Sequence, residues 1–224
     1  EKKNSLSRLI NPVEQVTIYV GEYSISGKPS SNVTYGKEYA ENNDVCCKFL
    51  IQILCDYPMF ILTNPLTPEI GKIFGGFMFP LTIPKNKGLI MGYRQRSLFT
   101  TINNQGSISV GIKIKIYAHG TVNNIEIIDV NSGKKIRINK VLNSGEVVEI
   151  DTNAGNRHVY GFVNGIEQDY IQYFDYDSEW LQLQTGINTL TFRSYSSGNV
   201  RDESYKRAEV IIEYKSARYN IPEE

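Results

Sequence analysis

The chain has 224 residues, of which 41% are hydrophobic, so it can bury a sizeable core without a disulfide or metal staple. Its 24 lysines and arginines balance its 24 aspartates and glutamates. This balance argues against a general attraction to nucleic acid, and no apolar run reaches the roughly 20 residues that span a bilayer. We therefore expect no nucleic acid partner and no membrane insertion.

The first part of the chain shows the patterns of short β-strands. Residues 16–20 and 23–29 are β-rich, are separated by Gly21 and predict a hairpin. The continuous apolar run 48–56 has strand length and ends before Pro58, so we expect it to be buried on both faces. The chain begins without Met and soon reaches the motif RLINP, which is typical of the middle of a domain, so we expect a preceding segment.

The three cysteines, Cys46, Cys47 and Cys55, are an odd number crowded into one segment. A disulfide framework needs pairs spread over a fold, and a bridge between adjacent residues is strained. We expect these cysteines to be buried and reduced. A zinc site has little support, because His119 and His158 lie far along the chain.

The middle of the chain changes in composition. Prolines, glycines and phenylalanines alternate between 63 and 90, a mixture that disfavours both helices and long strands. Beyond it, strand patterns recur at intervals of roughly 8–12 residues, which is typical of a β-sandwich or barrel. We therefore expect a mainly β fold with a partial β domain at 1–62, a crossover at 63–90 and a sandwich at 91–224.

Four short motifs in the second half each open with a polar or glycine-bearing turn and continue into an alternating apolar strand. They are NNQG at 103–106, IKIKIY at 112–117, GEVVEIDT at 145–152 and LQTGINTLTF at 183–192. We expect Gly106 and Gly186 to adopt positive φ, and Asn104 and Asn188 to bond nearby backbone. Asp151 and Thr152 would cap the end of a strand.

In this order, and with the upstream segments RLINP at 8–12 and FLIQILCDYPMF at 49–60, the motifs resemble the distal tail protein family of long-tailed phages, also described as siphophage tail proteins. The resemblance implies an N-terminal β domain that forms a hexameric ring at the end of the tail tube. It also implies a galectin-like, jelly-roll sandwich that contacts the tail-tip or host-adhesion proteins. On this resemblance we expect the first part of the family pattern to be missing from the sequence. The implied location is the virion tail, after synthesis in the host cytoplasm.

The segment 170–180, with sequence YIQYFDYDSEW, is the candidate contact site. Its aromatic residues are able to stack on sugar rings while its carboxylates bind hydroxyl groups, and its D-x-D-x-E spacing offers oxygen ligands for Ca²⁺. Packing of the aromatic side chains on a sheet edge would explain the same composition. The candidate residues for glycan or partner contact are Tyr173, Asp175, Tyr176, Asp177 and Trp180.

No catalytic motif accompanies this segment. A glycosidase needs two carboxyl groups facing each other across a cleft, and the sequence marks no partner for Asp175, Asp177 or Glu179. The chain also has no G-x-S-x-G nucleophile motif. We expect a non-enzymatic structural protein without a cofactor. A carbohydrate-binding sandwich module is the main alternative.

Overall fold

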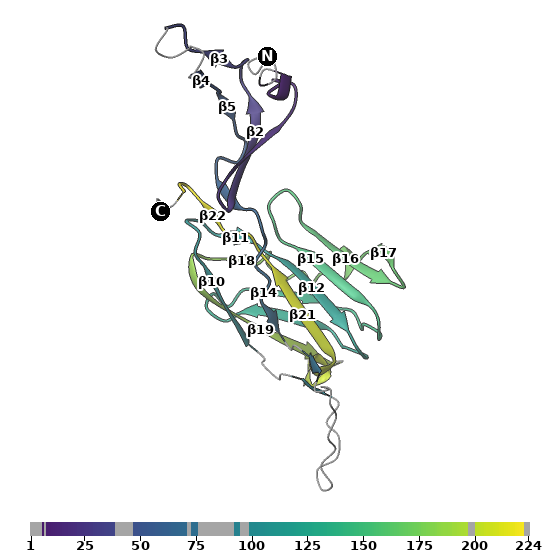
Figure 1. The fold of residues 1–224 in the computed structure, drawn as a ribbon. Coiled ribbons are helices and arrows are strands. Elements are labelled where there is room, and N and C mark those ends of the chain that lie inside the picture. The colour runs from purple at the N-terminus through teal and green to yellow at the C-terminus, as the bar shows by residue number, and fades with distance from the viewer. Residues whose placement is uncertain are drawn as a thin grey trace, which may run out of the picture. The chain divides into compact units, whose positions relative to one another are not determined.

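The computed structural model describes residues 6, 8–38, 47–70, 73–75, 92–94, 99–196 and 200–221. These residues form mainly β-strands, as the sequence predicts (Figure 1). The chain divides into two compact units. Unit 1 comprises Glu1–Asn64 with Ala217–Glu224, and unit 2 comprises Pro65–Ser216.

Unit 1 is built on an antiparallel hairpin, with Gly21 at φ 58° in its turn. Its main sheet has the strand order β1-β2-β6-β22, with β5 also paired to β2. The strands are β1 (Val16–Val20), β2 (Tyr23–Pro29), β3 (Thr34–Tyr35), β4 (Phe49–Leu50), β5 (Ile53–Leu54), β6 (Phe60–Leu62) and β22 (Ala217–Arg218). The predicted hairpin of residues 16–29 is confirmed.

The prediction that the run 48–56 is buried on both faces is wrong. Phe49, Leu50 and Leu54 are 50%, 59% and 69% exposed. The run forms two separate two-residue strands, and among the described residues β4 pairs with β3 and β5 with β2. Strands this short cannot form the central part of a sheet, so their side chains stay accessible within unit 1.

The prediction that the cysteines are buried is wrong for the two that the structure describes. Cys47 and Cys55 are free thiols, but Cys47 is exposed and Cys55 is half-buried. Cys47 precedes β4 and Cys55 follows β5, the two short strands of the run that the sequence wrongly placed in a core. Cys46 lies outside the described residues.

Unit 2 is a sandwich of two antiparallel sheets (Figure 1). Sheet I has the order β17-β16-β15-β12-β21-β7, and sheet II has the order β10-β19-β13-β14, with β20 paired to β19. The strands of sheet I are β7 (Glu69–Ile70), β12 (Lys113–Ala118), β15 (Val147–Asp151), β16 (His158–Val163), β17 (Ile166–Asp169) and β21 (Ala208–Glu213). Those of sheet II are β10 (Phe99–Asn104), β13 (Ile125–Asp129), β14 (Lys135–Ile138), β19 (Gly186–Tyr195) and β20 (Arg201–Asp202).

Further short strands and 3₁₀ helices of unit 2 lie within the described residues. They are β8 (Ile73–Gly75), β9 (Gly92–Arg94), β11 (Val110–Gly111), β18 (Gln182–Leu183), η1 (Ile171–Tyr173) and η3 (Ser204–Arg207). No helix in the described ranges is long and apolar enough to cross a membrane.

The core of unit 2 follows from strict alternation along its strands. On β12, Ile114 and Ile116 are completely buried while Lys113, Lys115 and Tyr117 are half-exposed. Successive side chains of a strand point to opposite faces, so one face of each sheet packs inward and the other faces out. Burying an isoleucine contributes roughly 1.5–3 kcal/mol, so these inward rows are the main source of stability.

The compact units differ from the expected domain ranges in two respects. Unit 2 already begins at Pro65, and the last strand, β22, belongs to unit 1. The strand β7, inside the expected crossover, pairs with β21 of sheet I. Residues 71, 72 and 76–91, which make up most of that crossover, lie outside the described residues.

Candidate functional site

The candidate segment 170–180 starts with a tyrosine that is packed into the sandwich. Tyr170 is 2% exposed, and its ring occupies the space that a side chain at Gly161 of β16 would need. A Cβ at Gly161 would lie 2.0 Å from the ring. Tyr173 packs edge-on against Tyr170 at 5.4 Å, and the Lys140 Nζ lies 4.8 Å from the Tyr170 ring. Tyr173 therefore contacts a buried ring while its own side chain is half-buried.

The second half of the segment separates the remaining predicted contact residues. Trp180 stacks on Phe174 at a centroid distance of 4.6 Å, and Phe174 forms a β-bridge with Ile138 at the end of β14. Tyr176, in contrast, is fully exposed. The predicted aromatic cluster is thus divided, with Trp180 held against Phe174 and Tyr176 open to solvent.

The acidic residues of the segment are divided in the same way. Asp175 accepts hydrogen bonds from the Asn139 side chain at 2.6 Å and from the Asp177 backbone at 3.0 Å. These bonds, with the charges of Arg137 and Lys135, hold the pKa of Asp175 below its usual value despite some burial. Glu179 pairs with Lys134 at 2.8 Å, whereas the Asp177 side chain is exposed.

The three acids of the D-x-D-x-E spacing therefore have different surroundings. Within the part of the chain that the structure describes, no group of three or more His, Cys, Asp or Glu residues is arranged to hold a metal ion. The arrangement of this segment gives no support to the calcium interpretation.

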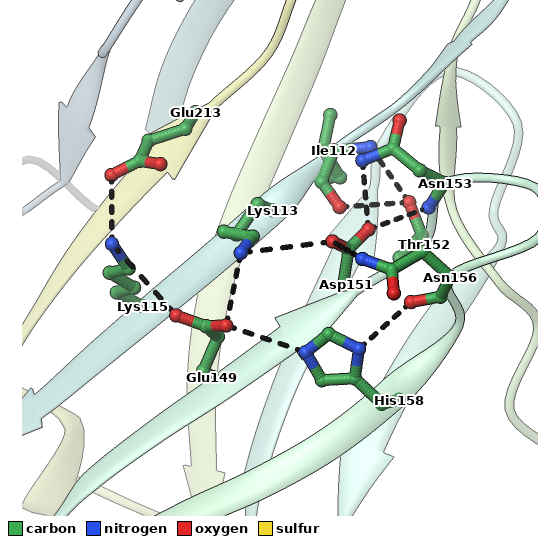
Figure 2. Close-up of polar contacts among 10 residues, drawn as sticks. All are labelled: Ile112, Lys113, Lys115, Glu149, Asp151, Thr152, Asn153, Asn156, His158 and Glu213. Atoms are coloured by element: carbon green, nitrogen blue, oxygen red, sulfur yellow. Dashed lines mark hydrogen bonds and ion pairs between the residues drawn. The ribbon is translucent and has the colours of Figure 1, made fainter. Parts of the chain in front are cut away.

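A second polar constellation, which sequence reasoning missed, lies on the outer face of sheet I (Figure 2). Two lysines of β12 connect carboxylates from both neighbouring strands. Lys113 lies 3.1 Å from Glu149 of β15, and Lys115 lies 3.2 Å from Glu213 of β21 and 3.8 Å from Glu149. These contacts form a ladder of alternating charges across three strands.

Glu149 is the centre of this ladder. Burial would raise its pKa, but hydrogen bonds from Lys113 and His158, with the charges of both lysines, outweigh burial and lower it. His158 Nε2 lies 3.3 Å from Glu149, and its Nδ1 lies 2.8 Å from the backbone oxygen of Asn156. The pKa of Lys115 is raised, chiefly by its hydrogen bond to Glu213. The ladder holds ionised groups in place and orients His158.

The strand-end motifs act as predicted caps. Asp151 accepts from the Asn153 backbone at 2.9 Å and from the side chains of Asn153 and Asn156. Thr152 Oγ1 accepts from the Ile112 backbone N–H at 2.7 Å and donates to the Ile112 oxygen at 3.0 Å (Figure 2). The capping prediction is confirmed, and its residues have structural roles.

The glycine and asparagine predictions were mostly right. Gly186 adopts φ 85°. The Asn188 Oδ1 accepts a hydrogen bond from the Gln184 backbone N–H, and the Asn188 Nδ2 donates one to the Gln184 backbone oxygen. Asn104 bonds the backbone of Ile108 and Leu183. Gly106 is the exception, because it is not among the described glycines with positive φ. Its N–H instead bonds the Asn104 side chain in an Asx-type turn.

Comparison with known proteins agrees with this architecture. Residues 105–207 match the family described as siphovirus-type tail component, C-terminal domain. The crystal structure of the SPP1 Dit (gp 19.1) protein, described as a paradigm of the hub adsorption apparatus in phages that infect Gram-positive bacteria, matches with a TM-score of 0.59. The identity is 13%, and the match covers 95% of this chain and 69% of that chain.

Two structures of the phage P2 baseplate in its activated conformation also match. The structure with Ca gives a TM-score of 0.41 at 14% identity, and the structure with Sr gives 0.39 at 12% identity. Each match covers 90% of this chain and 68% of the matched chain. No curated protein sequence matches the chain.

The fold is therefore that of the SPP1 Dit protein, with a galectin-like sandwich, as the sequence motifs imply. Residues 105–207, which form most of unit 2, are the part of the chain that is similar to the siphovirus-type tail component, C-terminal domain.

Proposed function

We propose that this chain is a non-enzymatic structural protein of the distal tail or baseplate of a phage or phage-like particle. Copies would form a hexameric hub that links the tail tube to the tail-tip and host-adhesion proteins. The observation that carries the proposal is the family match of residues 105–207 within a chain whose fold follows the SPP1 Dit protein over 95% of its length. The protein would be made in the host cytoplasm and then assembled into the virion tail.

The surface of unit 1 supports an assembling role. Its strands expose large apolar side chains that a monomeric unit would be expected to bury, including Tyr19 at 66% and Leu54 at 69%. Contiguous exposed apolar surface is typical of sites that contact other proteins. Copies of a chain that contact each other through unlike surfaces close into rings when the rotation between them permits it. Unit 1 is thus the proposed source of contacts between subunits.

The surroundings of the two histidines support a non-enzymatic role. His119 lies 3.2 Å from Glu209, and His158 is held between Glu149 and the Asn156 backbone. A nucleophilic site would instead place a histidine beside a serine, threonine or cysteine side chain. Neither ring has such a hydrogen bond among the described residues.

Labelling of virions tests the proposed location. Gold-conjugated antibodies against the purified chain should bind at the distal end of the tail in electron micrographs. Labelling of the capsid, or of infected cells but never of virions, would contradict the proposal. Antibodies against the major tail tube protein of the same particle would provide the control for access to the tail.

A carbohydrate-binding module is a second candidate function, because Tyr176 is fully exposed next to the exposed Asp177. An exposed aromatic ring beside a carboxylate is suited to stacking on a sugar face. In this case Tyr176→Ala should abolish binding of the chain to host cell-wall polysaccharide in calorimetry, whereas Tyr219→Ala should not. Absence of any polysaccharide binding by the unmodified chain would eliminate this candidate.

A further inference from the structure

The outer face of sheet I has an excess of negative charge. Antiparallel register places directly paired residues on the same face, and the pairing of β12 with its neighbours identifies which side chains lie outside. The outward carboxylates on β7, β15, β17 and β21 are Glu69, Glu149, Asp151, Glu167, Asp169, Glu209 and Glu213. The outward lysines on β12 are Lys113 and Lys115, so this face carries seven carboxylates and two lysines. We call this surface the acidic face.

The lysines do not neutralise the edge of the acidic face. Lys113 and Lys115 are already paired with Glu149 and Glu213. All four residues of the edge strand β17 are exposed. Among the residues that the structure describes, Glu167 and Asp169 form no ion pair, so they offer charge to an incoming partner.

The outer face of sheet II carries the opposite charge. Register places Lys135, Arg137, Arg193 and Arg201 on its outside, together with Glu126. Glu126 is the only carboxylate in this set, is 4% exposed and accepts a hydrogen bond from the Tyr195 hydroxyl at 2.8 Å. We call this surface the basic face.

The cations of the basic face are held in place by neighbouring side chains. The Arg137 guanidinium lies 4.7 Å from the centre of the Tyr195 ring. The charges of Arg137 and Lys135 help to lower the pKa of Asp175 in the adjoining segment. Arg193 and Arg201 have no ion pair in the described parts of unit 2, and the buried Nε of Arg193 has no hydrogen-bond acceptor.

We propose that the acidic face of one copy docks on the basic face of the next copy, so that the sandwiches of neighbouring subunits associate head to tail. The occupant follows from the charges, because a chain with no net charge presents two opposite faces of opposite sign. Contact between two acidic faces or two basic faces would be repelled, which disfavours a twofold dimer. The contact is heterologous, the type that generates rings.

This inference rests on the proposed hub and adds a second contact to it. Exposed apolar residues of unit 1 would supply the first contact, and the two charged faces of unit 2 would supply an orienting one. Half-buried aromatic residues lie within both faces, with Tyr160 on the acidic face and Tyr195 on the basic face. Such residues give a contact its apolar centre, while the charges set partner and orientation.

Charge reversal on the full chain tests the proposal. The acidic-face variant is Glu167→Lys with Glu209→Lys, and the basic-face variant is Lys135→Glu with Arg201→Glu. In each variant alone, like charges face each other across the contact. The protein concentration for half-assembly, measured by analytical ultracentrifugation at low salt, should therefore rise about tenfold or more. A mixture of the two variants restores opposite charges at every contact and should recover assembly. High salt should weaken the assembly of the unmodified chain.

The control variant exchanges an exposed ion pair outside both faces, Lys134→Glu with Glu179→Lys, and should assemble like the unmodified chain. Circular dichroism would verify that every variant is folded. Assembly that is equal in all variants would overturn the inference and leave the hub intact. A loss in the single variants that their mixture does not restore would also overturn it. Failure of the hub itself would appear differently, as an unmodified chain that stays monomeric.

Discussion

Asp202 accepts four hydrogen bonds on one carboxylate. It accepts from the Asn123 side chain at 2.6 Å, from the Ser204 backbone at 3.0 Å and from the hydroxyls of Ser204 and Ser194. Burial would raise its pKa, but these donors lower it to about 2. One ionised side chain thereby connects β19 with the segments before β13 and after β20.

This pKa predicts loss of stability in acid. The folded pKa of Asp202 lies below its ordinary value of 3.8, so its contribution is complete above about pH 4 and is lost as the pH falls towards 2. Asp202→Asn should lower the free energy of unfolding by about 1–3 kcal/mol at neutral pH and should be less sensitive to acid over this interval. Urea denaturation at a series of pH values measures both effects.

The exposed Asp177→Asn provides the control and should change the free energy of unfolding by less than about 0.5 kcal/mol. Equal stability of Asp202→Asn and the unmodified chain at neutral pH would show that the network contributes nothing.

Gly161 is required for packing rather than for backbone geometry. A Cβ at this position would lie 2.0 Å from the ring of Tyr170, which is almost completely buried and cannot move aside freely. We expect Gly161→Ala to lower the free energy of unfolding by about 1–3 kcal/mol, as overpacking does. The double variant Gly161→Ala with Tyr170→Ala should lose less than the sum of the single effects. Strict additivity in thermal or urea unfolding would contradict this explanation.

At the scale of elements, β12 is the central strand of sheet I and separates core from surface residue by residue. Ile116 is completely buried, whereas its neighbour Lys115 lies in the ladder on the outer face. Ile116→Ala should cost about 2–5 kcal/mol of unfolding free energy. Lys115→Ala removes partly exposed ion pairs and should cost no more than about 1 kcal/mol. Urea unfolding curves that rank these variants in the opposite order would contradict the assigned inward and outward faces.

Much of this element structure could be predicted from local sequence. The alternation of IKIKIY at 112–117 defines one buried face, and N-S-G at 131–133 marks the turn between β13 and β14, where Gly133 has φ 74°. Such signals need only neighbouring residues. The prediction that the run 48–56 is buried failed because apolar residues are equally compatible with a core and with a surface that contacts another chain.

The two charged faces could not be predicted from local sequence. Lys115 meets Glu213, which is 98 residues away, because β12 pairs with β21 across the whole unit. The order of strands in a sheet is set by topology and register rather than by local pattern. The candidate segment 170–180 shows the same limit. Its composition indicated contact chemistry, but only the fold separates the packed Trp180 from the exposed Tyr176.

At the scale of the whole molecule, the exposed apolar residues of unit 1 should control assembly. We expect Tyr19→Ser with Leu54→Ser to reduce the assembled fraction strongly while the fold of unit 2 remains intact, because both side chains are mostly exposed in the single chain. Size-exclusion chromatography with circular dichroism measures the two effects separately. Val141→Ser, an exposed apolar residue of unit 2, should have no such effect. If the unmodified chain, the double variant and Val141→Ser assemble equally, Tyr19 and Leu54 do not contribute to the subunit contacts.

The mass of the unmodified chain in solution tests the central claim most directly. Multi-angle light scattering over a range of protein concentrations should give a species of six times the mass of one chain, as expected for a hexameric tail hub. A monomer at every concentration would contradict self-assembly of this chain as the basis of its function.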